Sequence, residues 1–159
     1  MPATVVETVR RKTDPKCHAT TCRDGNCSLL LHGVPEPSVL ISLEHEAAPV
    51  AVGKPRSDYL FLGSDKNSRL WVAPIELTES KADFSKFAPQ LRAGAAIADK
   101  LLPKNIPEVK FRPIAVHGGI HRNEVNKFRQ SRNKISFRGK SVSIELTRCG
   151  SPLANALKG

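Results

Sequence analysis

Four strand-length apolar runs and one helical repeat dominate the hydropathy pattern of this chain. Polar turns and loops rich in proline and glycine separate the runs, as expected between strands. The runs span residues 39–44, 58–62, 70–77 and 109–116. Between the third and the fourth, apolar residues recur at helical spacing up to Pro103: Phe84, Phe87, Ala88, Leu91, Ala95, Ala98, Leu101 and Leu102. The pattern predicts an α/β fold with a βββαβ core, in which the strand after the long helix runs parallel to a neighbour.

Local signals add finer predictions around this core. Pro74 removes a ladder donor, so its strand is expected at a sheet edge or beside a bulge. Pro89 predicts a kink or a separate first turn in the long helix. Residues 1–16 fit either a short strand or a loosely held basic terminus. A glycine loop at residues 117–121 precedes a short helical segment, and residues 134–138 and 142–147 form a hairpin-like pair around Gly139.

The length of 159 residues suits one ordinary domain. We expect an N-terminal extension at residues 1–27, a single domain at 28–149 and a C-terminal tail at 150–159. No stretch approaches the roughly 20 apolar residues of a membrane span, so no membrane partner is expected. The first residues lack the charged and apolar regions of a secretory signal, which favours a cytoplasmic location.

The chain carries a formal net charge of +10, with 25 Lys and Arg against 15 Asp and Glu. This excess favours a polyanionic partner, and nucleic acid before a membrane surface. Many basic proteins bind no polyanion, so that interpretation stays open. The densest cationic stretch runs from Arg122 to Lys140, with seven basic residues against one glutamate. The candidate nucleic-acid-binding residues are Arg122, Lys127, Arg129, Arg132, Lys134, Arg138 and Lys140.

Three cysteines and a histidine lie close together near the N-terminus, as Cys17-His18, Cys22 and Cys27. Three thiolates and one imidazole are a ligand set that suits Zn²⁺, with Cys149 as an alternative fourth ligand. The spacing differs from the common Cys-x2-Cys knuckle, so reduced cysteines in a loop are the favoured interpretation. Disulfides are not expected in a cytoplasmic protein.

Two carboxylates belong to neighbouring predicted strands. Asp58 begins one strand and Glu76 ends the next, and a hairpin would place both at the same end. Two such carboxylates favour Mg²⁺, which prefers oxygen ligands. The ordinary interpretation makes Asp58 a turn residue, Glu76 a partner of a basic neighbour such as Arg56, and Gln90 an exposed helix residue.

The order of elements and these residues resemble the PD-(D/E)xK phosphodiesterase superfamily, which has the restriction-endonuclease-like fold. The motif is carried by Ser57-Asp58, by Glu76-x-Thr78 and by Gln90 in the helix. Residues 57–61 and 74–77 are also similar to strands of small uncharacterised bacterial proteins. The resemblance covers roughly residues 27–149. Thr78 stands where the family has a lysine, so Lys81 or Lys86 would have to supply the cation, and Glu44 would be an additional metal ligand.

The resemblance implies a restriction-endonuclease-like mixed central sheet flanked by helices, and a Mg²⁺-dependent phosphodiesterase that acts on nucleic acid. Its catalytic residues would be drawn from Asp58, Glu76, Thr78, Lys81, Lys86 and Gln90. The alternative is a non-catalytic module of the same fold that binds nucleic acid or protein, with its site degraded at position 78. The choice between DNA and RNA stays open, as does a homodimer. Residues 144–147 repeat Ile75-Glu76-Leu77-Thr78, which we interpret as coincidence because the flanking residues differ.

Overall fold

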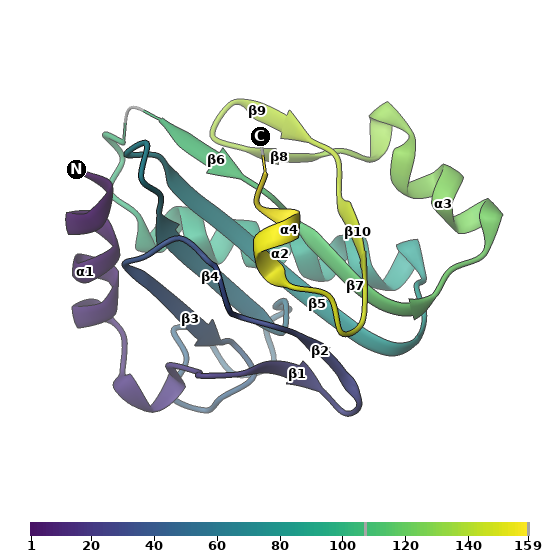
Figure 1. Cartoon of the computed structure of the whole chain (residues 1–159), viewed down its shortest axis with the longest axis horizontal. Helices are drawn as coiled ribbons and strands as arrows, with labels where there is room; N and C mark the ends of the chain where they lie inside the picture. Colours follow the sequence, from purple (N-terminus) through teal and green to yellow (C-terminus); the bar gives the residue numbers. More distant parts are fainter. Residues whose placement is uncertain (107, 159) are drawn as a thin grey trace.

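The computed structural model describes residues 1–106 and 108–158. Its centre is a six-stranded mixed sheet (Figure 1). The sheet order is β10-β7-β5-β4-β3, and β6 pairs with β5 beside β7. These strands span Ser38–Ser42 (β3), Tyr59–Ser64 (β4), Leu70–Lys81 (β5), Val109–Phe111 (β6), Ile114–Gly119 (β7) and Glu145–Arg148 (β10). The described residues also form four α-helices: Pro2–Lys12 (α1), Phe84–Leu101 (α2), Arg122–Arg129 (α3) and Leu153–Ala156 (α4).

The strand directions follow the predicted βββαβ order. β3 pairs antiparallel with β4, and β4 pairs antiparallel with β5. The chain then passes through α2 and returns in β6 and β7, which both lie parallel to β5. The α/β class and the parallel crossover after the long helix are therefore confirmed. Two small hairpins complete the strands: Cys22–Asp24 (β1) with Cys27–Leu29 (β2), and Ile135–Phe137 (β8) with Lys140–Val142 (β9).

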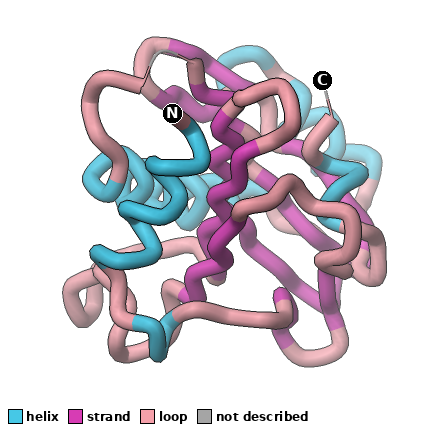
Figure 2. Tube along the Cα trace, turned by 60° about the vertical axis from the view of Figure 1, so that its left-hand side comes forward, coloured by secondary structure: helices cyan, strands magenta, loops and turns pink. Residues whose placement is uncertain are grey.

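Each face of the sheet has its own apolar core. Side chains of α1 and α2 pack with Leu60, Leu62 and Val72 on one face. Figure 2 shows helices on this side of the sheet. The β1–β2 hairpin and α4 pack with Phe61 and Trp71 on the other. Figure 1 shows α2 behind the sheet and α4 in front of it. Consecutive residues of β4 and β5 thus point to opposite layers, which explains why these strands read as apolar throughout.

Several local predictions were wrong. Residues 2–12 form α1 instead of a strand or a loose terminus, and Val6 and Val9 of this helix are buried. The helix α2 runs continuously through Pro89, so the first turn is not separate. Pro74 lies in the interior strand β5, at the interruption between β6 and β7 where neither pairs with it. Its missing N–H therefore costs no ladder hydrogen bond there.

The C-terminal third also differs from the prediction. β8 and β9 form the short hairpin around Gly139, but residues 145–148 form the separate strand β10, which pairs parallel with β7. His117 belongs to β7 and is buried, instead of opening a flexible loop. Within the described residues, no helix is both long enough and apolar enough to cross a bilayer.

Candidate functional site

Asp58 and Glu76 meet at one end of the β4–β5 pair. The register places Tyr59 opposite Ile75, so Asp58, just before β4, lies level with Glu76. The backbone N–H of Asp58 donates to Oε1 of Glu76 at 3.0 Å. The backbone N–H of Leu77 donates to Oδ2 of Asp58 at 2.9 Å. The two carboxyl groups are therefore fixed by reciprocal hydrogen bonds between neighbouring strands, as the hairpin prediction required.

Both carboxyl groups are half-buried and have perturbed acidities. Burial raises the pKa of Glu76 to about 8, and the nearby Asp58 carboxylate adds to the shift. Burial also raises the pKa of Asp58 to about 6, although the hydrogen bond from Leu77 opposes it. The charges of Asp24 and Glu44 contribute in the same direction to both pKa values. The end of the β4–β5 pair thus concentrates negative charge in a poorly solvated place.

A cavity of about 430 Å³ opens between this end of β5 and the first turns of α2. Glu76 and Thr78 line it from the strand, and Lys86 and Gln90 line it from the helix. Lys86 is exposed, and Gln90 accepts the backbone N–H of Arg56 through Oε1 at 3.2 Å. The structure therefore brings together four of the predicted site residues around one opening, with a lysine among them.

The close approach of α2 to the sheet depends on Gly94. A Cβ atom at this position would lie 2.3 Å from Oγ of Ser57 and 2.8 Å from Cβ of Pro74. No side chain fits there without displacing one of these neighbours. The glycine therefore lets α2 lie directly against the strands that carry Asp58 and Glu76, which sets the width of the cavity.

The other candidate residues of this site lie elsewhere. Nζ of Lys81 is 3.0 Å from Nε2 of His121, and Lys81 does not line the cavity of Glu76. Glu44 is exposed, and its negative charge contributes to the raised pKa values of Asp58 and Glu76. Across residues 1–106 and 108–158, no three His, Cys, Asp or Glu side chains are grouped so that they could hold a metal ion. Among these residues, Asp58 and Glu76 thus form a pair of carboxylates with no third His, Cys, Asp or Glu side chain grouped with them.

The four predicted zinc ligands are not assembled. Cys27 forms a disulfide with Cys149, and the Cα atoms are 4.9 Å apart. The expectation of reduced cysteines is wrong for these two. Cys17 and Cys22 are free and buried, and burial raises the pKa of Cys22 to about 12. Among the described residues, the zinc interpretation has no supporting group of ligands.

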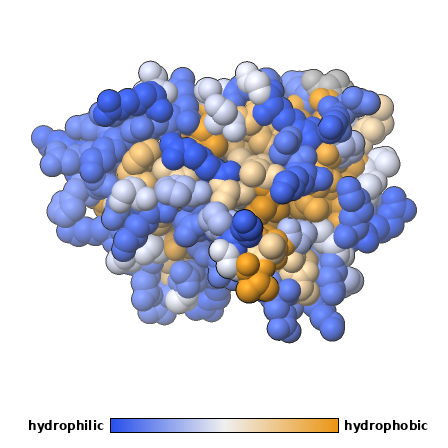
Figure 3. Space-filling view, turned by 180° about the vertical axis from the view of Figure 1, so that it is seen from behind, coloured by the Kyte–Doolittle hydropathy of each residue, from blue (hydrophilic) through white to orange (hydrophobic). Residues whose placement is uncertain are grey.

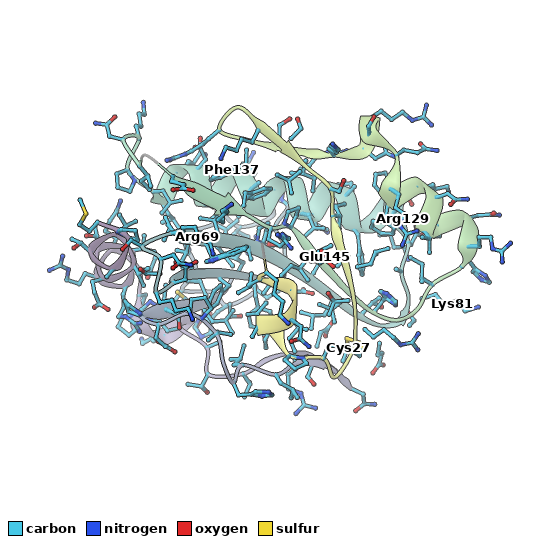
Figure 4. The ribbon with its side chains drawn as sticks, turned by 45° about the horizontal axis from the view of Figure 1, so that its top comes forward. Cys27, Arg69, Lys81, Arg129, Phe137 and Glu145 are labelled. Atoms are coloured by element: carbon cyan, nitrogen blue, oxygen red, sulfur yellow. A yellow bond between two sulfur atoms is a disulfide. The ribbon has the colours of Figure 1, made fainter. Side chains whose placement is uncertain are left out.

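The basic stretch contacts both ends of α2, with α3 at the N-terminal end and the β8–β9 turn at the C-terminal end. Figure 4 shows Lys81 and Arg129 toward the same end of the molecule, with Arg129 on α3. Phe128 of α3 packs edge-to-face against Phe84 and Phe87 of α2, which docks α3 beside the cavity. Arg122, Lys127, Arg129, Arg132, Lys134 and Lys140 are exposed. Six of the seven candidate nucleic-acid-binding residues are therefore at the surface.

Three of the seven basic side chains have partners within the chain, and one of them is Arg132, which donates to Oε1 of Gln130 at 3.0 Å. Arg138 donates to the Asp99 carboxylate at 2.6 Å and to the carbonyl oxygens of Asp99, Leu102 and Pro103, so its guanidinium holds the C-terminal end of α2. Lys127 forms an ion pair with Glu124 at 2.8 Å.

Sequence reasoning missed two features beside the cavity. The guanidinium of Arg56 donates to the carbonyl oxygens of Leu43, Ala51 and Lys54 and so orders the preceding loop. The disulfide joins Cys27 of the β1–β2 hairpin to Cys149, directly after β10, and Sγ of Cys149 lies 3.3 Å from the carbonyl oxygen of Thr78 in β5. The disulfide joins residues 122 positions apart, the Arg56 contacts reach back at most 13 residues, and no local motif signals either feature.

No protein-family model, curated protein or solved structure matches the chain.

Proposed function

We propose that the protein is a divalent-cation-dependent phosphodiesterase of the PD-(D/E)xK type, which acts on nucleic acid at Asp58 and Glu76. The observation that carries this proposal is the position of these two carboxylates at one end of a βββαβ core, where each accepts a backbone N–H from the neighbouring segment. The order β3-β4-β5-β7, antiparallel twice and then parallel, is the arrangement that the resemblance implies.

The donor set suits a hard cation. Asp58 and Glu76 each use one carboxyl oxygen to accept a backbone N–H, which leaves one oxygen of each for a ligand. Mg²⁺ is commonly held by one or two carboxylates together with waters and substrate phosphate oxygens. A cation would also offset the repulsion between two partly buried carboxylates, for which the described residues provide no ion-pair partner. When bound, it would activate a water and neutralise phosphate charge.

Protein side chains in and beside the cavity supply the other functions that the reaction requires. Lys86 takes the place of the family lysine and stabilises negative charge on the phosphate group, because it shares the cavity with Glu76 and has an exposed side chain. Gln90 positions the segment that leads into β4, because its side chain holds the backbone of Arg56. The exposed cations of α3 lie beside the opening and attract the polyanionic substrate.

One observation favours a non-catalytic alternative. Thr78 of β5 lies in the same cavity and carries no cation. If Lys86 does not replace the family lysine, the site holds a cation and nucleic acid without turnover. This second candidate function predicts salt-dependent binding with no cleavage.

The test is an assay of single-stranded and duplex DNA and RNA with Mg²⁺, Mn²⁺ or EDTA. We expect cleavage that requires the metal and falls to the level of the EDTA control in Asp58→Asn and Glu76→Gln. The matched control is Glu145→Gln, which alters the second Ile-Glu-Leu-Thr segment and retains the wild-type rate. Cleavage that persists in both site variants would rule out the proposed centre, and metal binding without any cleavage would favour the binding module.

A further inference from the structure

A second cavity lies further along α2 and belongs to the same side of that helix. Its volume is about 380 Å³. Lys86, Gln90, Ala93, Ile97 and Lys100 follow one another at intervals of four and three residues, so they form one stripe on the helix. The first two line the cavity of Glu76, and the last three line the second cavity. The two openings are therefore consecutive along a single surface.

The second cavity is apolar inside and basic at its edges. Ala93, Ala96 and Ile97 of α2 form one wall, and the loop residues Pro49, Val50, Ala51 and Pro55 form the other. Lys54 and Lys100 contribute the charged groups, and both are exposed. Figure 3, which views the molecule from the α2 side, shows an apolar strip between hydrophilic side chains. A ligand that fits this composition has a flat or apolar body and negative charge beside it.

The loop wall is held in place before any ligand binds. The Arg56 guanidinium donates to the carbonyl oxygens of Ala51 and Lys54 at 3.0 Å, and the Lys54 N–H donates to Ala51 at 3.1 Å. The backbone of Arg56 is in turn bound to Gln90. The wall of the second cavity is thus connected through Arg56 to Gln90 of the first cavity. An ordered wall lowers the entropic cost of binding.

We propose that this second cavity is a nucleotide subsite, which receives the base of an unpaired nucleotide next to the phosphodiester at Asp58 and Glu76. The base packs between Ile97 and the proline-rich loop, and Lys54 and Lys100 bind the adjoining phosphates. This inference rests on the proposed function and adds the substrate class, a single-stranded nucleic acid. The apolar interior favours an unpaired base because a duplex keeps its bases stacked inside and presents its phosphates to the protein.

Binding of a short fluorescein-labelled single strand, measured by fluorescence anisotropy in EDTA, tests the subsite without any cleavage. The double variant Lys54→Ala, Lys100→Ala removes both cations of the cavity. The matched control Arg92→Ala, Lys104→Ala removes two exposed cations that do not line it. We expect the cavity variant to weaken binding at least about tenfold, and the control to weaken it about twofold, because each lost phosphate contact lowers the affinity. Ala96→Glu, at an exposed helix position in the wall, should also weaken binding.

Tighter binding of a single strand than of a duplex of the same sequence supports the subsite, and an RNA strand in parallel identifies the preferred sugar. Equal losses in the cavity and control variants would overturn it, as would tighter binding of the duplex. Thermal melts of each variant separate lost binding from misfolding. If the subsite is wrong, metal-dependent cleavage at Asp58 and Glu76 remains measurable. If that cleavage is absent, the binding affinities of the two double variants still show whether the second cavity binds the strand.

Discussion

Two identical tetrapeptides, residues 75–78 and 144–147, lie on opposite sides of β7 and have different surroundings. Ile114 of β7 pairs with Ile75 on one side and with Glu145 on the other, so the two copies are offset by one residue. Neighbouring residues in a sheet point to the same face, and a shift of one residue reverses the face. Glu76 therefore faces α2, and Glu145 faces the opposite layer with α4.

The offset gives the two glutamates opposite electrostatic environments. Glu145 lies 3.5 Å from the guanidinium of Arg112, which also donates to the carbonyl oxygen of Ala156. Glu76 forms no ion pair among the described residues and shares its surroundings with Asp58. The sequence Ile-Glu-Leu-Thr therefore does not by itself determine the environment of its glutamate. The strand register and the neighbouring charges determine it.

The largest expected effect concerns the lysine side chain that the proposed reaction requires in the Glu76 cavity. Lys86→Ala should lower metal-dependent cleavage by about a hundredfold, because it removes the one lysine that lines this cavity. Lys81→Ala should change the rate less than about threefold, because Lys81 contacts His121 instead. Rates under single-turnover conditions measure both. Equal losses would contradict the assignment, and Thr78→Lys in the Lys86→Ala background should restore part of the rate.

A smaller effect concerns stability and pH in the absence of metal. The pKa of Glu76 is raised to about 8 in the folded protein, against an ordinary value of 4.5. The folded state then holds a proton that the unfolded state releases, so stability falls as pH rises from about 4.5 to about 8. Glu76→Gln removes this penalty and should stabilise the protein above pH 8 by on the order of 1 kcal/mol, roughly 2–4 °C in Tm.

The Glu145→Gln variant should change stability in the opposite direction to Glu76→Gln. It breaks the ion pair with Arg112, which is partly exposed, and should lower stability by at most about 1 kcal/mol. Thermal unfolding in EDTA at pH 5 and pH 9 measures both variants. A Glu76→Gln protein that is destabilised at pH 9 would show that the carboxylate is well accommodated when ionised.

Most of the sheet core could be predicted from the sequence because its signals are local. The apolar runs and the helical repeat ending before Pro103 place β3, β4, β5 and α2, and a long helix between strands implies the parallel crossover. The proximity of Asp58 and Glu76 follows from one turn between two strands. Pro74 misled the prediction because its missing donor falls at the gap between β6 and β7, which only the tertiary structure reveals.

The parts that could not be predicted depend on contacts between distant residues. Cys27 and Cys149 are 122 residues apart, so spacing within the N-terminal cluster carries no information about their pairing. The α1 helix is basic at its end and owes its position to the burial of Val6 and Val9 against the sheet. The sequence around Arg138 predicts an exposed surface cation. In the structure Arg138 caps the C-terminal end of α2, because the β8–β9 turn returns to that helix.

The central claim is that Asp58 and Glu76 form a divalent-cation site and that the second copy of the tetrapeptide does not. Isothermal titration with Mn²⁺ tests it most directly, on the wild-type protein, Asp58→Asn, Glu76→Gln and Glu145→Gln at one pH. We predict saturable binding by the wild-type protein and by Glu145→Gln, and its loss in Asp58→Asn and in Glu76→Gln. Undiminished Mn²⁺ binding by both site variants, or no binding by the wild-type protein, would contradict the account.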